Sequence, residues 1–241
     1  MKTGKELITN INNTIINKAS VGFWWIGQMG YAIKLGDKII YIDAYLRENP
    51  RRTIPPLFKP QDVNNADIIM GTHDHSDHID REVWGDLSIS SPGAKFLVPN
   101  LVLDSVSKDL EIPYDRLIGM DDGISVEIDG IKVRAIASAH ELLHQDEETG
   151  QYPFLGYIIE ANGVKIYHAG DTCIYPGYFE KIKALGPFDI IFLPINGRDA
   201  VRYKRNTIGN MTYQEAVDLA GYLKPGLVVP GHYEMFEQNS E

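Results

Sequence analysis

The spacing of apolar residues predicts one helix followed by strands in the first part of the chain. Within residues 1–20, Leu7, Ile8, Ile11, Ile15 and Ile16 share one helical face that Asn and Lys interrupt. Three short runs rich in aromatic and β-branched residues come next, and glycine turns join them: "SVGFWWIG" (20–27), "GYAIKLG" (30–36) and "KIIYIDA" (38–44). We therefore expect an N-terminal helix and an antiparallel three-stranded meander.

The pattern then changes in a Pro- and Arg-rich stretch, "RENPRRTIPPLFKP" (47–60), which predicts a surface excursion able to flank a binding cleft. "ADIIMGTHDHSDHID" (66–80) reads as a short buried strand that opens into a polar loop. Helical spacing returns in "PNLVLDSVSKDL" (99–110), and a second series of strands is expected to begin near Ile118.

Two hairpins are predicted in that second series. "ISVEIDGIKVRAIASAH" (124–140) turns at Asp129-Gly130, and "FLGYIIEANGVKIYHAGDT" (154–172) turns at Asn162-Gly163. A helix at 177–186, a buried strand at 188–194, a helix at 212–223 and the strand "LVVPGH" (227–232) follow, with Thr212 and Glu215 spaced as a capping box. Strands followed by helices, twice over, predict an α/β (α+β) fold, a four-layer αββα sandwich forming one domain over residues 1–241.

Composition narrows the class of protein. The chain is 44% hydrophobic and 23% charged, which is typical of globular proteins, and it has no apolar run of membrane-spanning length. The first segment lacks the unbroken apolar stretch of a secretory signal. Cys173 is the single cysteine, so an internal disulfide is excluded, and we interpret it as a packed thiol. These features predict a cytoplasmic protein.

A formal net charge of −10 disfavours extended contact with nucleic acid or an anionic membrane. A local basic loop remains compatible with a small anion. The expected partner is therefore a small anionic molecule, and a homo-oligomer is a further candidate.

Metal-capable side chains gather in "GTHDHSDHID" (71–80), which has three histidines and three aspartates directly after a buried strand. Further histidines end or follow strand-like segments in "AIASAH", "KIYHAGD" and "LVVPGH". Strand ends can converge at one edge of a layered fold, and imidazole and carboxylate ligands suit divalent zinc, manganese or iron. His73 and His75, two apart in an extended segment, project to one side and can hold one ion, while Asp77 and His78 can reach a second.

Ordinary structural roles are the alternative for each residue taken alone. Taken singly, His144 and His168 are better explained as ordinary surface or core histidines. Asp171 could be a turn residue, and His232 could end a strand. For "HDHSDH", that alternative requires crowded polar groups after a buried strand with no counter-ion, which is costly. The recurrence of such residues at several strand ends favours a metal site.

These residues resemble the metallo-β-lactamase fold hydrolases, whose H-x-H-x-D-H signature matches His73, His75, Asp77 and His78. The family's third histidine, bridging aspartate and final histidine match His140, Asp171 and His232, and Asp43 stands in the place of its structural aspartate. The resemblance implies one metal on His73, His75 and His140, a second on Asp77, His78 and His232, and Asp171 between them. Asp74 and His168 would orient ligand histidines through their second ring nitrogens.

Within the superfamily, "FWWIGQMGYAIKL", "THDHSDHID", "YHAGDT" and residues 195–216 are similar to the ascorbate-6-phosphate lactonase branch, although that branch has an aspartate near the position of His140 and longer chains. The resemblance implies hydrolysis of a small lactone or other ester. One or two divalent ions, zinc before manganese or iron, would lower the pKa of water to about 7 and make hydroxide available. Asp77 or Asp171 would then accept or relay the proton.

A basic loop places Arg198, Arg202, Lys204 and Arg205 between a buried strand and a capped helix. It could clamp a substrate phosphate or carboxylate, with Arg198 nearest the strand end, or it could be a solvated charged loop. His144 and Tyr175 are further candidates for lining the pocket.

Three other functions remain as alternatives. A phosphodiesterase acting on a small phosphodiester keeps the same metal chemistry. A redox di-iron protein of the flavodiiron kind would place a glutamate at the position of His75 and would need a flavin domain. A secreted β-lactamase would need an export signal and a different residue at the position of His78.

Overall fold

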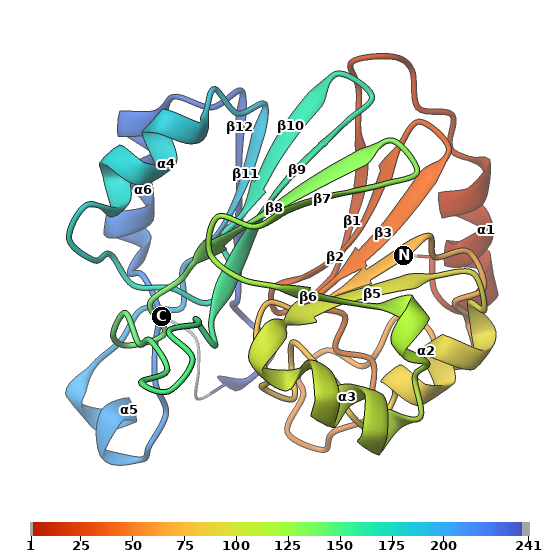
Figure 1. Ribbon diagram of the computed structural model, residues 1–241, viewed down its shortest axis with the longest axis horizontal. Helices are drawn as coiled ribbons and strands as arrows, with labels where there is room; N and C mark the ends of the chain where they lie inside the picture. Colours follow the sequence, from red (N-terminus) through yellow and green to blue (C-terminus); the bar gives the residue numbers. More distant parts are fainter. Residues whose placement is uncertain (1, 238–241) are drawn as a thin grey trace.

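The computed structural model describes residues 2–237 and contains two six-stranded sheets (Figure 1). The first sheet has the order β1-β2-β3-β4-β5-β6. Its strands are β1 (Gly22–Gly27), β2 (Gly30–Leu35), β3 (Lys38–Ile42), β4 (Ile68–Met70), β5 (Lys95–Pro99) and β6 (Leu117–Met120). The second sheet has the order β12-β11-β10-β9-β8-β7. Its strands are β7 (Ser125–Ile128), β8 (Ile131–Ala137), β9 (Leu155–Ala161), β10 (Val164–His168), β11 (Ile190–Pro194) and β12 (Leu227–Gly231).

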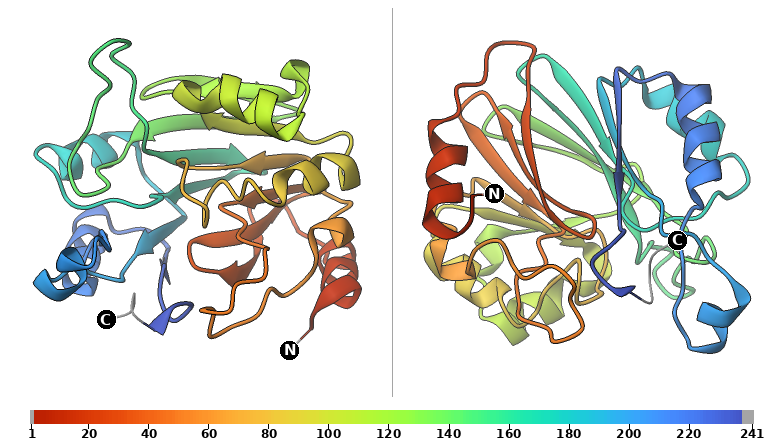
Figure 2. Two further views of the ribbon diagram at one scale, coloured as in Figure 1. Left: turned by 90° about the horizontal axis from the view of Figure 1, so that it is seen from below. Right: turned by 180° about the vertical axis from the view of Figure 1, so that it is seen from behind.

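The helices lie outside the two sheets. They are α1 (Gly4–Asn13), α2 (Trp84–Ser90), α3 (Leu103–Leu110), α4 (Tyr178–Leu185), α5 (Ala200–Lys204) and α6 (Tyr213–Leu223), with short 3₁₀ turns at Pro60–Asp62, Asn100–Val102 and Tyr114–Arg116. Helices α1, α2 and α3 cover the first sheet, and α4 and α6 cover the second (Figures 1 and 2). The four-layer αββα order predicted from the sequence is confirmed. The predicted single domain, residues 1–241, includes residue 1 and residues 238–241, which lie outside the described residues.

The central core lies between the sheets. Tyr31 and Ile40 of the first sheet and Tyr157 and Phe192 of the second are fully buried in one cluster. Tyr31 packs on Phe192 with ring centroids 4.3 Å apart. Because both sheets bury their inner faces here and their outer faces under helices, most strands are apolar on both sides.

The predicted meander is confirmed, since β1, β2 and β3 pair antiparallel. Both predicted hairpin turns also form: φ is +48° at Asp129 and +82° at Gly130, and +54° at Asn162 and +76° at Gly163. Consecutive left-handed residues match the twist of the flanking strands. The capping box of α6 forms too, because the Thr212 hydroxyl accepts from the backbone N–H of Glu215 while the Glu215 carboxylate accepts from that of Thr212.

Two expectations were wrong. The strand near Ile118, β6, does not start the second sheet but pairs parallel with β5 at the edge of the first, because α3 returns the chain to that edge. The first helix ends at Asn13, before Ile15, which is 88% exposed. The ammonium group of Lys34 donates to the carbonyl oxygens of Ile11 and Asn12 at 3.0 and 2.6 Å and satisfies these terminal acceptors there.

Among the described residues, none of the helices combines the length and the apolar character needed to cross a bilayer.

Candidate metal centre

The ends of four strands supply the centre. His73, His140 and Asp171 each follow the last residue of a strand by three positions, after β4, β8 and β10, and His232 follows β12 directly. In the second sheet β8, β10 and β12 run in the same direction, so their carboxyl ends share one edge. The end of β4 in the facing sheet reaches the same edge.

Hydrogen bonds fix the segments that follow these strands relative to one another. The backbone N–H of Leu155 donates to the carbonyl of Thr72, and the Tyr157 hydroxyl donates to that of Gly71, both at 3.0 Å. The backbone N–H of Cys173 donates to the carbonyl of Ala139 at 2.7 Å and joins the loops that carry His140 and Asp171. The backbone segments that carry the candidate metal ligands are therefore held in place by hydrogen bonds, both between the two sheets and within the second sheet.

Seven side chains meet around Asp171 and His73. Nε2 of His73 lies 2.9 Å from Nδ1 of His75. Oδ2 of Asp171 lies 3.1 Å from Nε2 of His232 and 3.8 Å from Nε2 of His140. Candidate ligand atoms lie within 4.8 Å of one another in three groups: His73, His75 and His140; His73, His78 and Asp171; and Asp77, His78 and His232. The structure thus brings together all seven residues that the sequence placed at the metals.

Unpaired polar atoms in this cluster fit a cation. Nε2 of His78 and Oδ1 of Asp171 are buried, lie 3.4 Å apart, and have no hydrogen-bond partner among the described residues. Leaving buried polar atoms unpaired costs free energy, and imidazole nitrogens with carboxylate oxygens form the donor set of divalent zinc, manganese and iron. The residues therefore fit one or two such ions.

Asp43 and Thr72 lie behind the ligands, at the ends of β3 and β4. Oδ2 of Asp43 lies 2.8 Å from Nδ1 of His78, and the Thr72 hydroxyl donates to the same oxygen at 2.9 Å. Nδ1 of His73 lies 3.1 Å from the Thr72 hydroxyl. These contacts orient two ligand histidines. Sequence reasoning assigned Asp43 only as a structural aspartate and did not single out Thr72, although a hydroxyl directly before His73 was the available signal.

The two residues expected to orient ligand histidines, Asp74 and His168, form their hydrogen bonds with other groups, although Nδ1 of His168 lies 4.0 Å from Oδ2 of Asp43. The Asp74 carboxylate accepts two hydrogen bonds from Arg81, at 2.8 and 2.9 Å, on the outside of the loop. His168 donates from Nε2 to the carbonyl of Met29 at 2.8 Å and accepts from the backbone N–H of Gly170 at Nδ1, so both ring nitrogens are engaged by backbone. Gln28, which was not predicted from the sequence, also holds a candidate ligand: its side-chain amide donates to Oδ2 of Asp77 at 3.1 Å.

Burial and opposite charges together set the pKa values in the cluster. Burial alone would raise the pKa of Asp171, but His232 and His78 hold it well below its usual value. Burial alone would lower the pKa of His232, but Asp171 and Asp77 raise it to about 9. Burial lowers the pKa of His140 to about 4. The Asp171 carboxylate is therefore ionised at neutral pH and attracts a cation.

A cavity of about 260 Å³ opens on this cluster. His75, Asp77, His140, Asp171, Asn206, Ile208 and His232 line it.

The three residues expected to bind substrate are not in this lining. The Arg198 guanidinium makes two 2.7 Å hydrogen bonds to Glu215. The Tyr175 hydroxyl donates to the carbonyl of Ala137 at 2.8 Å, and His144 is exposed on the loop after His140. Cys173 is buried, as expected of a packed thiol.

An αββα sandwich whose strand ends carry this His/Asp cluster defines a class of metal-dependent hydrolase. The family described as the beta-lactamase superfamily domain matches residues 38–233, and the chain belongs to that superfamily. A UPF0173 metal-dependent hydrolase of Sulfurisphaera tokodaii is 30% identical over 216 residues, 88% of this chain and 84% of that protein. One from Thermococcus onnurineus is 34% identical over 212 residues, 87% and 83% of the two chains.

Solved structures show the same fold. A metallo hydrolase from the hyperthermophilic archaeon Ignicoccus hospitalis matches with a TM-score of 0.69 and 23% identity, over 92% of this chain and 86% of that one. The predicted superfamily is confirmed, and so is the prediction of a metal-dependent hydrolase.

Proposed function

We propose that the protein hydrolyses a small ester or lactone that carries an anionic group. The observation that carries this proposal is the opening of the buried His/Asp cluster onto a cavity of only about 260 Å³. Binding cavities for small molecules usually measure about 300–1,000 Å³, so this one suits a compact reacting group at the metals. The formal net charge of −10 argues against a long polyanion.

Seven residues would hold the metals: His73, His75 and His140 the first, Asp77, His78 and His232 the second, with Asp171 between them. When bound, the ions supply Lewis acidity and a hydroxide nucleophile at neutral pH. Asp77 lines the cavity, and Gln28 holds its carboxylate in place. Burial would raise the pKa of Asp77, but His78 and His232 hold it well below its usual value, so Asp77 is ionised at neutral pH and its carboxylate can help to hold a cation.

Zinc is the metal we propose first, because histidine-rich sites with carboxylates suit it; manganese and iron are the alternatives. Elemental analysis of protein purified without added metal tests this assignment. A visible absorption spectrum of a redox-active iron pair would instead support the di-iron alternative. The buried thiol of Cys173 supports a reducing compartment, so we propose a cytoplasmic enzyme.

The substrate class is tested by turnover. We expect the metal-loaded enzyme to open small lactones or cleave carboxylic esters faster than it cleaves bis(p-nitrophenyl) phosphate. A chelator should abolish the activity, and added zinc, manganese or iron should restore it. Faster cleavage of the phosphodiester would replace this proposal with a phosphodiesterase.

A further inference from the structure

Two more cavities adjoin the metal cavity through shared lining residues. The first, about 210 Å³, shares Asp77 with it and is also lined by Arg47, Asn49, Arg51 and Thr207. The second, about 550 Å³, shares Arg51 with the first and is also lined by Arg52 and Arg205. Arginine side chains therefore lie next to the metal cavity, on the far side of Asp77.

One short segment after α5 borders all three cavities. Asn206 and Ile208 line the metal cavity, Thr207 lines the first arginine cavity, and Arg205 lines the second. Asn206 has a φ of +55°, a left-handed conformation that asparagine tolerates and that redirects the backbone between Arg205 and Thr207. Arg205 is therefore a direct chain neighbour of residues that line the metal cavity.

The loop after β3 forms the opposite wall. The backbone of Arg52 forms an isolated antiparallel β-bridge with that of Phe236, so this loop and the end of the described chain lie side by side (Figure 2, right). Arg52 is anchored, because its guanidinium donates to the carbonyls of Ile54 and Tyr45 at 2.8 and 3.0 Å. It also stacks over the Tyr45 ring. The loop that carries Arg51 is thus held in place without using the Arg51 side chain.

The guanidinium groups of Arg51 and Arg205 are available to a ligand. Arg47 is paired with Glu82, and Arg198 and Arg202 with Glu215 and Asp199. By contrast, no hydrogen bond or ion pair within residues 2–237 engages the guanidinium of Arg51 or of Arg205. Glu237 is the carboxylate that borders their cavity. Two arginine side chains that no residue within 2–237 pairs lie beside a metal centre in a chain of net charge −10, and this arrangement indicates a site for an anion.

We propose that Arg51 and Arg205 bind the anionic group of the substrate, a carboxylate or a phosphate monoester, while the scissile ester lies in the metal cavity. This inference rests on the proposed function for the placement of the ester. The Asp77 carboxylate between the cavities repels an anion, so the anionic group lies beyond it, towards the arginines. Guanidinium groups suit both anions because they donate in a planar fork.

The kinetic test compares two esters that differ only in an anionic substituent, using Arg51→Gln and Arg205→Gln. We expect each variant to raise KM for the anionic ester about tenfold and to leave kcat/KM for the neutral ester unchanged. Arg51→Lys should recover part of the loss, since it restores the charge without the fork. Equal losses for both esters, or an unchanged KM for the anionic ester, would overturn the proposal.

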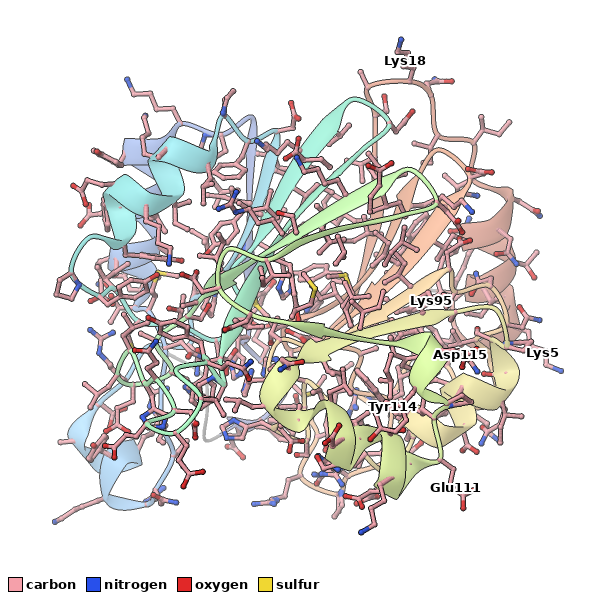
Figure 3. The ribbon with its side chains drawn as sticks, viewed as in Figure 1. Lys5, Lys18, Lys95, Glu111, Tyr114 and Asp115 are labelled. Atoms are coloured by element: carbon pink, nitrogen blue, oxygen red, sulfur yellow. The ribbon has the colours of Figure 1, made fainter. Side chains whose placement is uncertain are left out.

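Lys18→Gln is the matched control. It removes the same unit of charge from an exposed side chain in the loop between α1 and β1, at the opposite end of the molecule from α5 (Figure 3). We expect it to leave both kinetic constants unchanged. A KM increase in this variant equal to that in Arg51→Gln would show that net charge, not the site, controls anion binding, and would also overturn the proposal.

Calorimetric titration of the metal-loaded proteins separates this inference from the proposed function. Inorganic phosphate and acetate serve as probes, because their binding requires no turnover. We expect Arg51→Gln and Arg205→Gln to weaken binding of at least one probe about tenfold, and the stronger probe to identify the preferred anion. If the wild type cleaves neither ester but shows this difference, the hydrolase proposal fails and the anion site stands. Identical binding in wild type and both variants excludes the site.

Discussion

The contact between Asp43 and His78 predicts a sharp effect of Asp43→Asn on metal binding. A histidine that binds a cation through Nε2 carries its proton on Nδ1, and Nδ1 of His78 lies 2.8 Å from Oδ2 of Asp43. The other oxygen, Oδ1, accepts from the backbone N–H of Thr72 at 2.8 Å. Both oxygens of the Asp43 carboxylate therefore accept hydrogen bonds, whereas a side-chain amide has only one oxygen that can accept.

The magnitude follows from this geometry. In either orientation of the amide that Asp43→Asn introduces, its NH₂ group faces one of the two donors in a fully buried place. An unsatisfied buried donor costs about 1–3 kcal/mol. Because 1.4 kcal/mol is about tenfold in an equilibrium constant, affinity for the metal at His78 should fall about 5–150-fold. Competition with a chromophoric chelator measures this change directly.

Asp67→Asn is the control for losing a carboxylate in the same sheet. Asp67 also accepts from a backbone N–H, that of Ile39 at 2.8 Å, and pairs with Lys38, but it lies at the start of β4, away from the metal ligands. We expect this variant to retain wild-type metal affinity. If Asp43→Asn binds metal as tightly as Asp67→Asn does, Asp43 does not orient His78 and the reasoning is refuted.

Three further outcomes are expected. The pKa of His232 in the metal-free protein is raised from 6.5 to about 9, and its proton must leave before metal binds, so calorimetric titrations should show metal affinity rising by up to about tenfold per pH unit between these values. Protonated His232 also stabilises the metal-free protein; thermal unfolding should show this stability fully present below pH 6.5 and lost as the pH rises through about 9. Asp171→Ala should lose metal and activity but keep its circular dichroism spectrum, since the core lies between the sheets; full activity would contradict the assigned role. Thr212→Ala should lower the free energy of unfolding by about 0.5–2 kcal/mol in urea titrations without changing kcat, and unchanged stability would mean that the capping box contributes nothing.

Local patterns in the sequence determined most of the elements. The hairpins at Asp129-Gly130 and Asn162-Gly163 and the capping box at Thr212 were predictable because their geometry depends on a few adjacent residues. The clustering of histidines and aspartates after strand-like runs also indicated a shared metal site, since the carboxyl ends of such strands meet at one edge.

Only the tertiary structure decided which partner each side chain and strand would take. β6 joined the first sheet because α3 returned the chain beside β5, a pairing between segments that no local pattern encodes. Arg198, the favoured anion ligand in the sequence, pairs with Glu215, whereas Arg51 and Arg205 come from segments far apart in the chain and line one cavity. Charge and residue type are properties of the sequence, but the availability of a charge depends on which counter-charges the fold brings within reach.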